Sequence, residues 1–323
     1  MTPAFGTAEE FTSHRPRVFG LAYRLLGSAE DAEDTVQEAY LRWRSADRAA
    51  IGHPGAWLAK VVTNLCLNRL TSARVQRERY VGSWLPEPVF TEDGTLGPLE
   101  SAEQRDAVSA ALLMLLERLT PTERAVYVLR EAFAYSHRDI AEVLDLGEAN
   151  CRQLYRRAVQ HVAAARTRFE PTLGRQRALV ESFVSAAREG DLAGLERLLA
   201  EDAIWWSDGG GKVSAALRPI VGREKVMRFL GGVQRFAGGL ALTVAEVNGA
   251  SALVVHAARR LVAVASFELR DSGIVQVQVV VNPDKLVFAG RQFAAMSPGG
   301  GTRGGVGSPG SCHICGRSSV PSG

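Results

Sequence analysis

Apolar residues recur at spacings of three and four through most of residues 9–80, which predicts a helical N-terminal domain. One arc of the segment 29–43 is apolar and is formed by Ala32, Val36, Ala39, Tyr40 and Trp43. The neighbouring arc carries carboxylates, so this helix should pack with one face and leave an acidic stripe on the other. The sequence GHPG at 52–55 breaks the chain before a second long helix, predicted over 56–78.

Helical patterning resumes at 100–118 and continues into a capped helix that begins at Thr120-Pro121. Residues 136–168 then predict a helix-turn-helix, with a capping box at its start and the turn at Leu146-Gly147. In its second helix the apolar stripe is formed by Cys151, Leu154, Tyr155, Ala158 and Val162. Arg152, Gln153 and Arg156 fall on the opposite face, where they can present paired hydrogen-bond donors and acceptors to base edges in a DNA major groove.

From about residue 174 the pattern becomes mixed. Helices are predicted at 175–189, 191–200 and 222–231. Strands are predicted at 203–207, 240–247, 252–258, 260–270 and 274–281. Helices followed by a run of strands indicate a small α+β domain with a curled antiparallel sheet.

The chain therefore divides into five parts, with predicted bounds of 1–80, 81–99, 100–170, 174–290 and 291–323. The second part is rich in proline and glycine and is interpreted as an interdomain linker. Trp84, Leu85 and Phe90 are unusual in a spacer and favour a docking surface over water. The last part is rich in glycine, serine and proline, and we expect it to be disordered.

Charge is segregated along the chain, although the net charge of the 323 residues is only +3. Residues 28–39 contain five acidic and no basic residues, whereas residues 60–80 are mainly basic and residues 148–168 hold five arginines against one glutamate. Such blocks indicate different partners for different faces. Neither a membrane span nor a signal-peptide pattern is present in the sequence, so we expect a cytoplasmic protein without membrane contact.

Cysteine usage and motif content give no sign of a cofactor or metal. Cys66 and Cys151 lie on apolar helical faces, and the pair Cys312 and Cys315 in the tail offers too few ligands for a closed zinc site. A phosphate-binding glycine loop and a nucleophile elbow are also missing from the sequence. We therefore expect no cofactor, no resident metal and no enzyme activity.

Three segments in this order resemble the sigma-70-type RNA polymerase sigma factors of the extracytoplasmic-function (ECF) class. They are LLGSAEDAEDTVQEAYLRW, HPGAWLAKVVTNLCLNRL and LTPTERAVYVLREAFAYSHRDIAEVLDLGEANCRQLYRRA. The resemblance covers residues 9–80 as sigma region two and 100–168 as sigma region four. It implies two all-α domains that bind core RNA polymerase and promoter DNA to direct promoter-specific initiation of transcription.

The resemblance also implies roles for individual residues. Carboxylates expected to dock on core polymerase are Asp31, Glu33, Asp34 and Glu38. Residues expected near the opened minus-ten element are Lys60, Asn64, Asn68, Arg69, Arg74 and Arg77. Residues expected to read the minus-thirty-five element are Asn150, Arg152, Gln153, Arg156 and Arg157.

The third domain resembles the SnoaL-like, cone-shaped α+β extension of the sigma-J-like subgroup. Three short motifs carry this resemblance: YVGSWLPEP at 80–88, DGGGK at 208–212 and NPDKL at 282–286. The expected regulatory interface comprises Trp84, Leu85, Pro86, Glu87, Pro88, Asp208, Gly209, Gly210, Gly211, Lys212, Asn282, Pro283, Asp284, Lys285 and Leu286. We expect this domain to pack on region two and the linker, and to stand in for a separate anti-sigma factor.

Three alternatives remain open at the level of sequence. The third domain could be an enzyme, with Asp202, Asp208, His256 and the Trp205-Trp206 pair as candidate groups, or a sensor of a small molecule. The whole chain could instead be a conventional helix-turn-helix regulator, although such a protein needs neither the acidic stripe nor the basic helix at 56–79. Turnover by the third domain, or co-purification with core polymerase, would separate these hypotheses.

Overall fold

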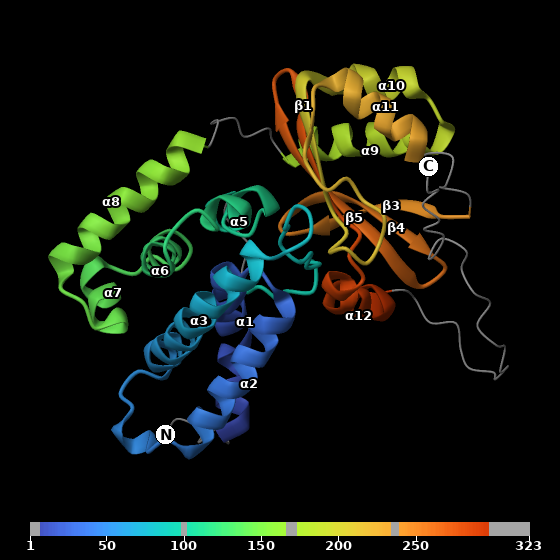
Figure 1. The fold of residues 1–323 in the computed structure, drawn as a ribbon. Coiled ribbons are helices and arrows are strands. Elements are labelled where there is room, and N and C mark those ends of the chain that lie inside the picture. The colour runs from blue at the N-terminus through green and yellow to red at the C-terminus, as the bar shows by residue number, and fades with distance from the viewer. Residues whose placement is uncertain (1–6, 98–101, 166–172, 234–238, 297–323) are drawn as a thin grey trace, which may run out of the picture.

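The computed structural model describes residues 7–97, 102–165, 173–233 and 239–296. Figure 1 shows two helical domains beside a C-terminal domain built on a curved sheet, which confirms the predicted fold class. No helix within these described ranges is long and apolar enough to cross a membrane.

The N-terminal helical domain consists of three long helices and one turn of 3₁₀ helix. Their bounds are α1 (Thr7–Leu26), α2 (Ala29–Ser45), η1 (Arg48–Ala50) and α3 (Pro54–Glu78). Ser28 caps α2 by accepting the backbone N–H of Asp31. The predicted apolar arc of α2 is buried at Ala32, Val36, Ala39 and Trp43, and Trp43 contacts Trp57 of α3 with ring centroids 5.7 Å apart.

The middle helical domain contains the predicted helix-turn-helix. Its helices are α4 (Ala102–Asp106), α5 (Ala110–Leu116), α6 (Pro121–Glu131), α7 (His137–Leu144) and α8 (Glu148–Ala165). Capping boxes start α6 at Thr120 and α7 at Ser136. The turn between α7 and α8 comprises residues 145–147 and so includes the predicted Leu146-Gly147, and its left-handed residue is Asp145, with φ of 54°.

The C-terminal domain has helices on a six-stranded sheet of order β2-β1-β6-β5-β4-β3. Its helices are α9 (Leu173–Glu189), α10 (Leu192–Leu198), α11 (Arg223–Val233), η3 (Asp284–Leu286) and α12 (Val287–Met296). Its strands are β1 (Leu199–Asp208), β2 (Ile220–Val221), β3 (Ala241–Val247), β4 (Ala250–Ala257), β5 (Arg260–Arg270) and β6 (Gly273–Val280). The expected antiparallel sheet was wrong in one respect, because β1 and β6 pair in parallel.

Helix α12 is the element that the sequence pattern missed. It continues past the expected domain end at 290 and packs against β5 and α2. Phe288 at its start stacks on Phe19 of α1, with ring centroids 5.4 Å apart. The last helix of the C-terminal domain therefore contacts the N-terminal helical domain directly.

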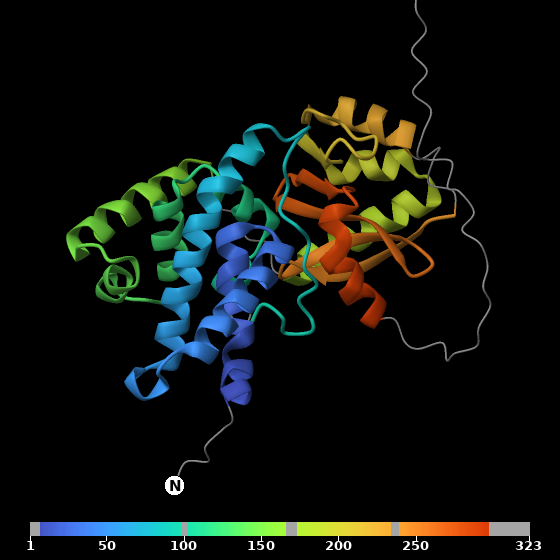
Figure 2. The ribbon, with the colours of Figure 1, turned by 60° about the horizontal axis from the view of Figure 1, so that its bottom comes forward.

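Hydrophobic packing joins the parts of the chain. One buried cluster runs through both helical domains, from Phe11 of α1 to Val162 of α8. A separate cluster joins Leu85 and Phe90 of the linker to Val247 and Val264 of the sheet. Figure 2 shows the linker, in cyan, passing between the blue helices and the orange and red elements. Burying each of these two linker side chains contributes roughly 1.5–3 kcal/mol to the docked arrangement.

Candidate functional site

The candidate minus-thirty-five residues lie on the open face of α8. Arg152, Gln153, Arg156 and Asn150 are exposed, whereas the residues of the apolar stripe are buried except for Tyr155, which is half-buried. Arg157 is also exposed, and its Nε lies 3.3 Å from the Glu123 carboxylate. Arg152 pairs with Glu148 within the same helix, so this half of the site is an exposed basic surface whose charges are partly paired.

Helix α3 carries the candidate minus-ten residues, and here other parts of the chain cover the basic groups. The Lys60 ammonium lies 2.7 Å from Asp145 Oδ1 and donates to the Glu142 carbonyl at 2.9 Å. Asn64 is half-buried and Asn68 is exposed. The side chain of Arg74 lies outside the described part of the structure.

Arg69 of α3 lies among the candidate polymerase-docking carboxylates of α2. Its guanidinium is 3.7–4.0 Å from the carboxylate oxygens of Asp31, Asp34 and Glu38. Glu33 pairs instead with Arg15 of α1 at 2.5 Å. The acidic stripe is therefore on the surface but partly neutralised by neighbouring arginines.

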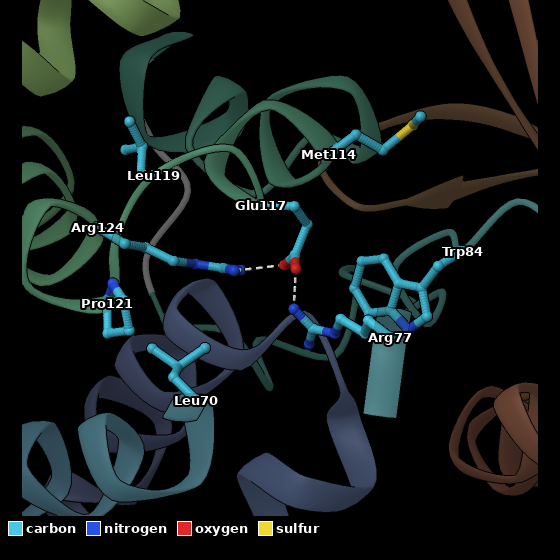
Figure 3. Close-up of a pocket in the computed structure, with 8 residues that line it drawn as sticks. All are labelled: Leu70, Arg77, Trp84, Met114, Glu117, Leu119, Pro121 and Arg124. Atoms are coloured by element: carbon cyan, nitrogen blue, oxygen red, sulfur yellow. Dashed lines mark hydrogen bonds and ion pairs between the residues drawn. The ribbon is translucent and has the colours of Figure 1, made fainter. Parts of the chain in front are cut away.

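Arg77, a candidate minus-ten residue, was expected on an exposed basic face, but its side chain is largely buried. Its guanidinium is mostly buried, where it pairs with Glu117, donates to the Leu26 carbonyl at 2.6 Å and lies 4.0 Å from the centroid of a Trp84 ring (Figure 3). Burial, together with the nearby charge of Arg124, lowers the pKa of Arg77 to about 9. In this conformation Arg77 holds the linker and the middle helical domain rather than facing solvent.

The DGGGK and NPDKL motifs meet the linker in a buried polar network. Asp208 is fully buried and accepts hydrogen bonds from Tyr80 Oη at 2.5 Å and from the Leu85 amide at 2.8 Å. Lys285 Nζ lies 2.7 Å from the same carboxylate and donates to the Leu85 carbonyl at 2.5 Å. Burial lowers the pKa of Lys285 to about 8, although Asp208 opposes this shift. We call Tyr80, Leu85, Asp208, Asn282 and Lys285 the linker clamp.

Close approach in the clamp requires glycine. A Cβ on Gly210 would lie 2.2 Å from Asn282 Nδ2 and 2.9 Å from Tyr80 Oη. Gly210 also has φ of 59°, a conformation that L side chains rarely adopt.

The other motif residues lie around this contact. Gly209 and Leu286 are buried, Gly211 and Pro283 are exposed, and Lys212 forms an exposed ion pair with Asp284. The clamp itself therefore takes Asp208, Asn282 and Lys285 from the two C-terminal motifs, and Gly210 leaves room for their close approach.

Glu87 connects the linker to the start of α2. Its carboxylate accepts the backbone N–H groups of Ala29 at 2.7 Å and Glu30 at 3.1 Å, and its own N–H donates to the Gly27 carbonyl. Burial raises the pKa of Glu87, opposed by these hydrogen bonds. Pro86 and Pro88 are buried on either side. One rigid segment thus contacts the C-terminal domain through Leu85 and the acidic helix through Glu87.

Several contact residues were not predicted as site residues. Asn248 donates through Nδ2 to Tyr23 Oη at 2.5 Å and to the Val108 carbonyl at 2.8 Å, and it accepts the Val89 amide. Gln292 of α12 pairs with both backbone groups of Phe90 at 3.0 Å. Asn248-Gly249 suggests only a hairpin turn, so the sequence offered no signal for its second role.

The candidate catalytic groups of the C-terminal domain do not converge. Asp208 is occupied by the clamp, and Asp202 is exposed beside Arg270 at 3.4 Å. His256 lies on β4, which β5 and β6 separate from β1, and its Nδ1 is 2.8 Å from the Ala258 carbonyl. Trp205 and Trp206 hydrogen-bond to Ser207 and Gln276. Among the described residues, no group of three or more potential ligands could hold a metal; Cys312 and Cys315 lie outside them.

Both helical domains match known protein families. The Sigma-70 region 2 family model matches residues 11–75, and the Sigma-70 region 4 model matches residues 109–162. The chain is 38% identical to the ECF RNA polymerase sigma factor SigJ of Mycobacterium tuberculosis, over 85% of this chain and 92% of that protein. It is 29% identical to the probable ECF RNA polymerase sigma factor SigI of the same species, with the same coverage of both chains.

A solved structure extends this similarity to the fold. The crystal structure of Mycobacterium tuberculosis SigJ matches with a TM-score of 0.70 and 34% sequence identity, covering 87% of this chain and 98% of that chain. Because this match is much longer than the two sigma regions, it includes the C-terminal domain. The chain therefore belongs to the ECF family of RNA polymerase sigma factors and carries a C-terminal α+β extension.

Proposed function

We propose that the C-terminal domain regulates this sigma factor in cis by holding the linker between regions two and four. The observation that carries the proposal is the linker clamp, in which Asp208 and Lys285 bind the amide and the carbonyl of Leu85. Leu85 is held through both its N–H and its C=O in a buried site, so it cannot shift without breaking both hydrogen bonds. The domain therefore constrains the spacing of the two DNA-reading modules.

The same segment relates the clamp to the polymerase-docking surface. Glu87 satisfies two backbone N–H groups at the start of α2, a position where helix ends favour negative charge. Two residues earlier, Leu85 is held by the C-terminal domain. We propose that movement of the clamp reaches the acidic stripe through this short, proline-flanked segment.

The residues proposed for the two promoter contacts differ in how exposed they are. Exposed Arg152, Gln153 and Arg156 of α8 are proposed to read the minus-thirty-five element. Lys60 and Arg69 of α3 are proposed to hold the opened minus-ten strand, for which they must first leave their carboxylate partners. Since Asp145 belongs to region four, the contact of Lys60 also joins the two regions.

This regulatory role is proposed to require neither catalysis nor a separate anti-sigma protein. Asp208, the most buried candidate acid, has its carboxylate occupied by Tyr80, Leu85 and Lys285. Turnover of a small carbonyl compound by the protein would contradict the non-catalytic part of the proposal.

Promoter-dependent transcription with core polymerase tests the proposal. We expect truncation after about residue 170, and separately Gly210→Ala, to change the amount of transcript, because both remove the clamp. Gly232→Ala is the matched control, since a Cβ there meets nothing within 4 Å. Unaltered transcription from both clamp variants would contradict the proposed regulation.

A further inference from the structure

An open pocket lies where α3, the linker and helices α5 and α6 meet, and it adjoins the linker clamp, because Lys285 Nζ lies 4.2 Å from the centroid of a Trp84 ring. It encloses about 320 Å³, within the range of small-molecule sites. Its walls are apolar at Leu70, Met114, Leu119 and Pro121, and its polar groups are Arg77, Arg124 and Glu117 (Figure 3). Trp84 of the linker closes one side.

The pocket holds two guanidinium groups and one carboxylate. Arg77 and Arg124 both pair with Glu117, one with each of its oxygens. The side chain of Arg124 is 2% exposed and that of Arg77 is 17% exposed, so both charges are largely removed from water. Burial lowers the pKa of Arg124 to about 9, as it does that of Arg77. A net positive charge in a concave, poorly solvated site attracts anions.

Backbone carbonyl groups also hold the two arginines in place. Arg77 donates to the Leu26 carbonyl, and Arg124 donates through Nε and one terminal nitrogen to the Arg24 carbonyl at 3.3–3.4 Å. One terminal nitrogen of each guanidinium, Nη1 in both, points at the Glu117 carboxylate. Guanidinium groups fixed in this way suit tetrahedral oxyanions, which accept paired hydrogen bonds.

Of the three charged side chains in the pocket, Glu117 is the one that can move out of it. It directly follows the last residue of α5 as the C-cap, and its side chain is 21% exposed. A carboxylate at this position can rotate toward solvent, where it is well hydrated. With Glu117 withdrawn, two cationic groups face one pocket, which is the charge that a dianion neutralises.

We propose that this pocket binds a small phosphoryl dianion, which replaces the Glu117 carboxylate between Arg77 and Arg124. The nearby carboxylates of Asp31 and Glu87 act on Arg77 as well and limit the affinity for more highly charged ligands. A bound ligand would contact α3, the linker and α6, and the contact that Glu117 makes at the end of α5 would be lost. Occupancy would therefore alter how region four is held against region two.

Isothermal titration calorimetry of the full chain at constant ionic strength tests this site, with inorganic phosphate, pyrophosphate and ADP as separate probes. Removing one guanidinium, in Arg77→Met, should weaken phosphate binding by about tenfold or more. Glu117→Gln should tighten it by roughly threefold or more, because the competing charge is gone. A gain of affinity cannot arise from misfolding, so the second variant remains informative if the first is unstable.

The exposed pair Arg177 and Glu181 of α9 supplies matched controls, and Arg177→Met and Glu181→Gln should leave binding unchanged. Tighter binding of ADP than of phosphate would support a nucleotide as the source of the phosphoryl group, and equal binding would support free phosphate. Absence of heat with all three probes would overturn the proposal. Binding that neither Arg77→Met nor Glu117→Gln changes would overturn it as well.

Discussion

Helices α3 and α8 each present a row of basic and amide side chains, but other parts of the chain cover these two rows to different extents. On α8, Arg152, Gln153 and Arg156 face open solvent. On α3, Lys60 is paired with Asp145, and Arg77 is buried against Glu117 and Trp84. The residues proposed for minus-thirty-five recognition are thus exposed, whereas those proposed for the minus-ten contact are partly covered.

The origin of the partners explains this difference. Helix α8 packs on α6 and α7, which precede it directly, so its free face follows from local periodicity. By contrast, Lys60 and Arg77 of α3 pair with Asp145 and Glu117, which are remote in sequence and belong to region four, and Arg69 pairs with carboxylates of α2. The proposed regulation would therefore act mainly on region two.

The largest effect is expected from Asp208→Ala, which removes the acceptor of the clamp and leaves Lys285 buried without its carboxylate. We expect the free energy of unfolding to fall by about 3 kcal/mol, as when one partner of a buried pair is lost. Urea unfolding measures this change. Asp202→Ala, at an exposed ion pair on the same strand, should cost far less. Equal costs for the two variants would contradict a structural role for the clamp.

A smaller effect should follow from Arg156→Ala on the uncovered helix. Loss of a base-reading arginine should weaken binding of the holoenzyme to its promoter by about 1–3 kcal/mol. Competition binding against minus-thirty-five variants measures this loss, with Arg177→Ala on α9 as the control. If affinity falls equally for all sequences, Arg156 contacts phosphate and does not read bases.

Asp139→Ala tests whether the helix-turn-helix is locally stabilised. The hydrogen bonds with Ser136 lower the pKa of Asp139. Its contribution is therefore present above the unfolded pKa near 3.8 and is lost as pH falls through the lower folded value. We expect a loss of about 0.5–1 kcal/mol at neutral pH. Thermal unfolding should show this difference shrinking in acid; a difference independent of pH would exclude the capping role.

The smallest effect is expected from Asp145→Asn, which releases Lys60 and keeps a residue that tolerates the left-handed backbone. Because the pair is exposed, it contributes less than about 1 kcal/mol. Affinity of the free protein for a minus-ten single strand should rise by roughly twofold. Asp271→Asn, at an exposed pair with Arg175, is the control. Lower affinity of the Asp145 variant would contradict the idea that this contact covers Lys60.

The sequence predicted well what depends on neighbouring residues. Helix periodicity and caps placed α7 and α8, and the exposed face of α8 followed from them. Alternating apolar runs located β3 to β6 closely, and the apolar linker residues correctly indicated a docking surface.

What the sequence could not give depends on segments far apart in the chain. The parallel pairing of β1 with β6 and the helix α12 result from packing across the domain. Arg77 was expected beside DNA because its own helix is basic, whereas Glu117, forty positions later, draws it into the interior. The partners of Asn248 are equally remote and could not be inferred from a turn motif.

Transcription by core polymerase with the full-length Lys285→Met protein tests the central claim most directly. The substitution removes the contact to the Leu85 carbonyl, and faster hydrogen exchange of the Leu85 amide would verify that the clamp has opened. We predict that promoter-dependent transcript then changes by about fivefold or more, the scale of coupling between distinct sites. Transcription equal to that of the unmodified protein, with the clamp shown to be open, would contradict regulation in cis.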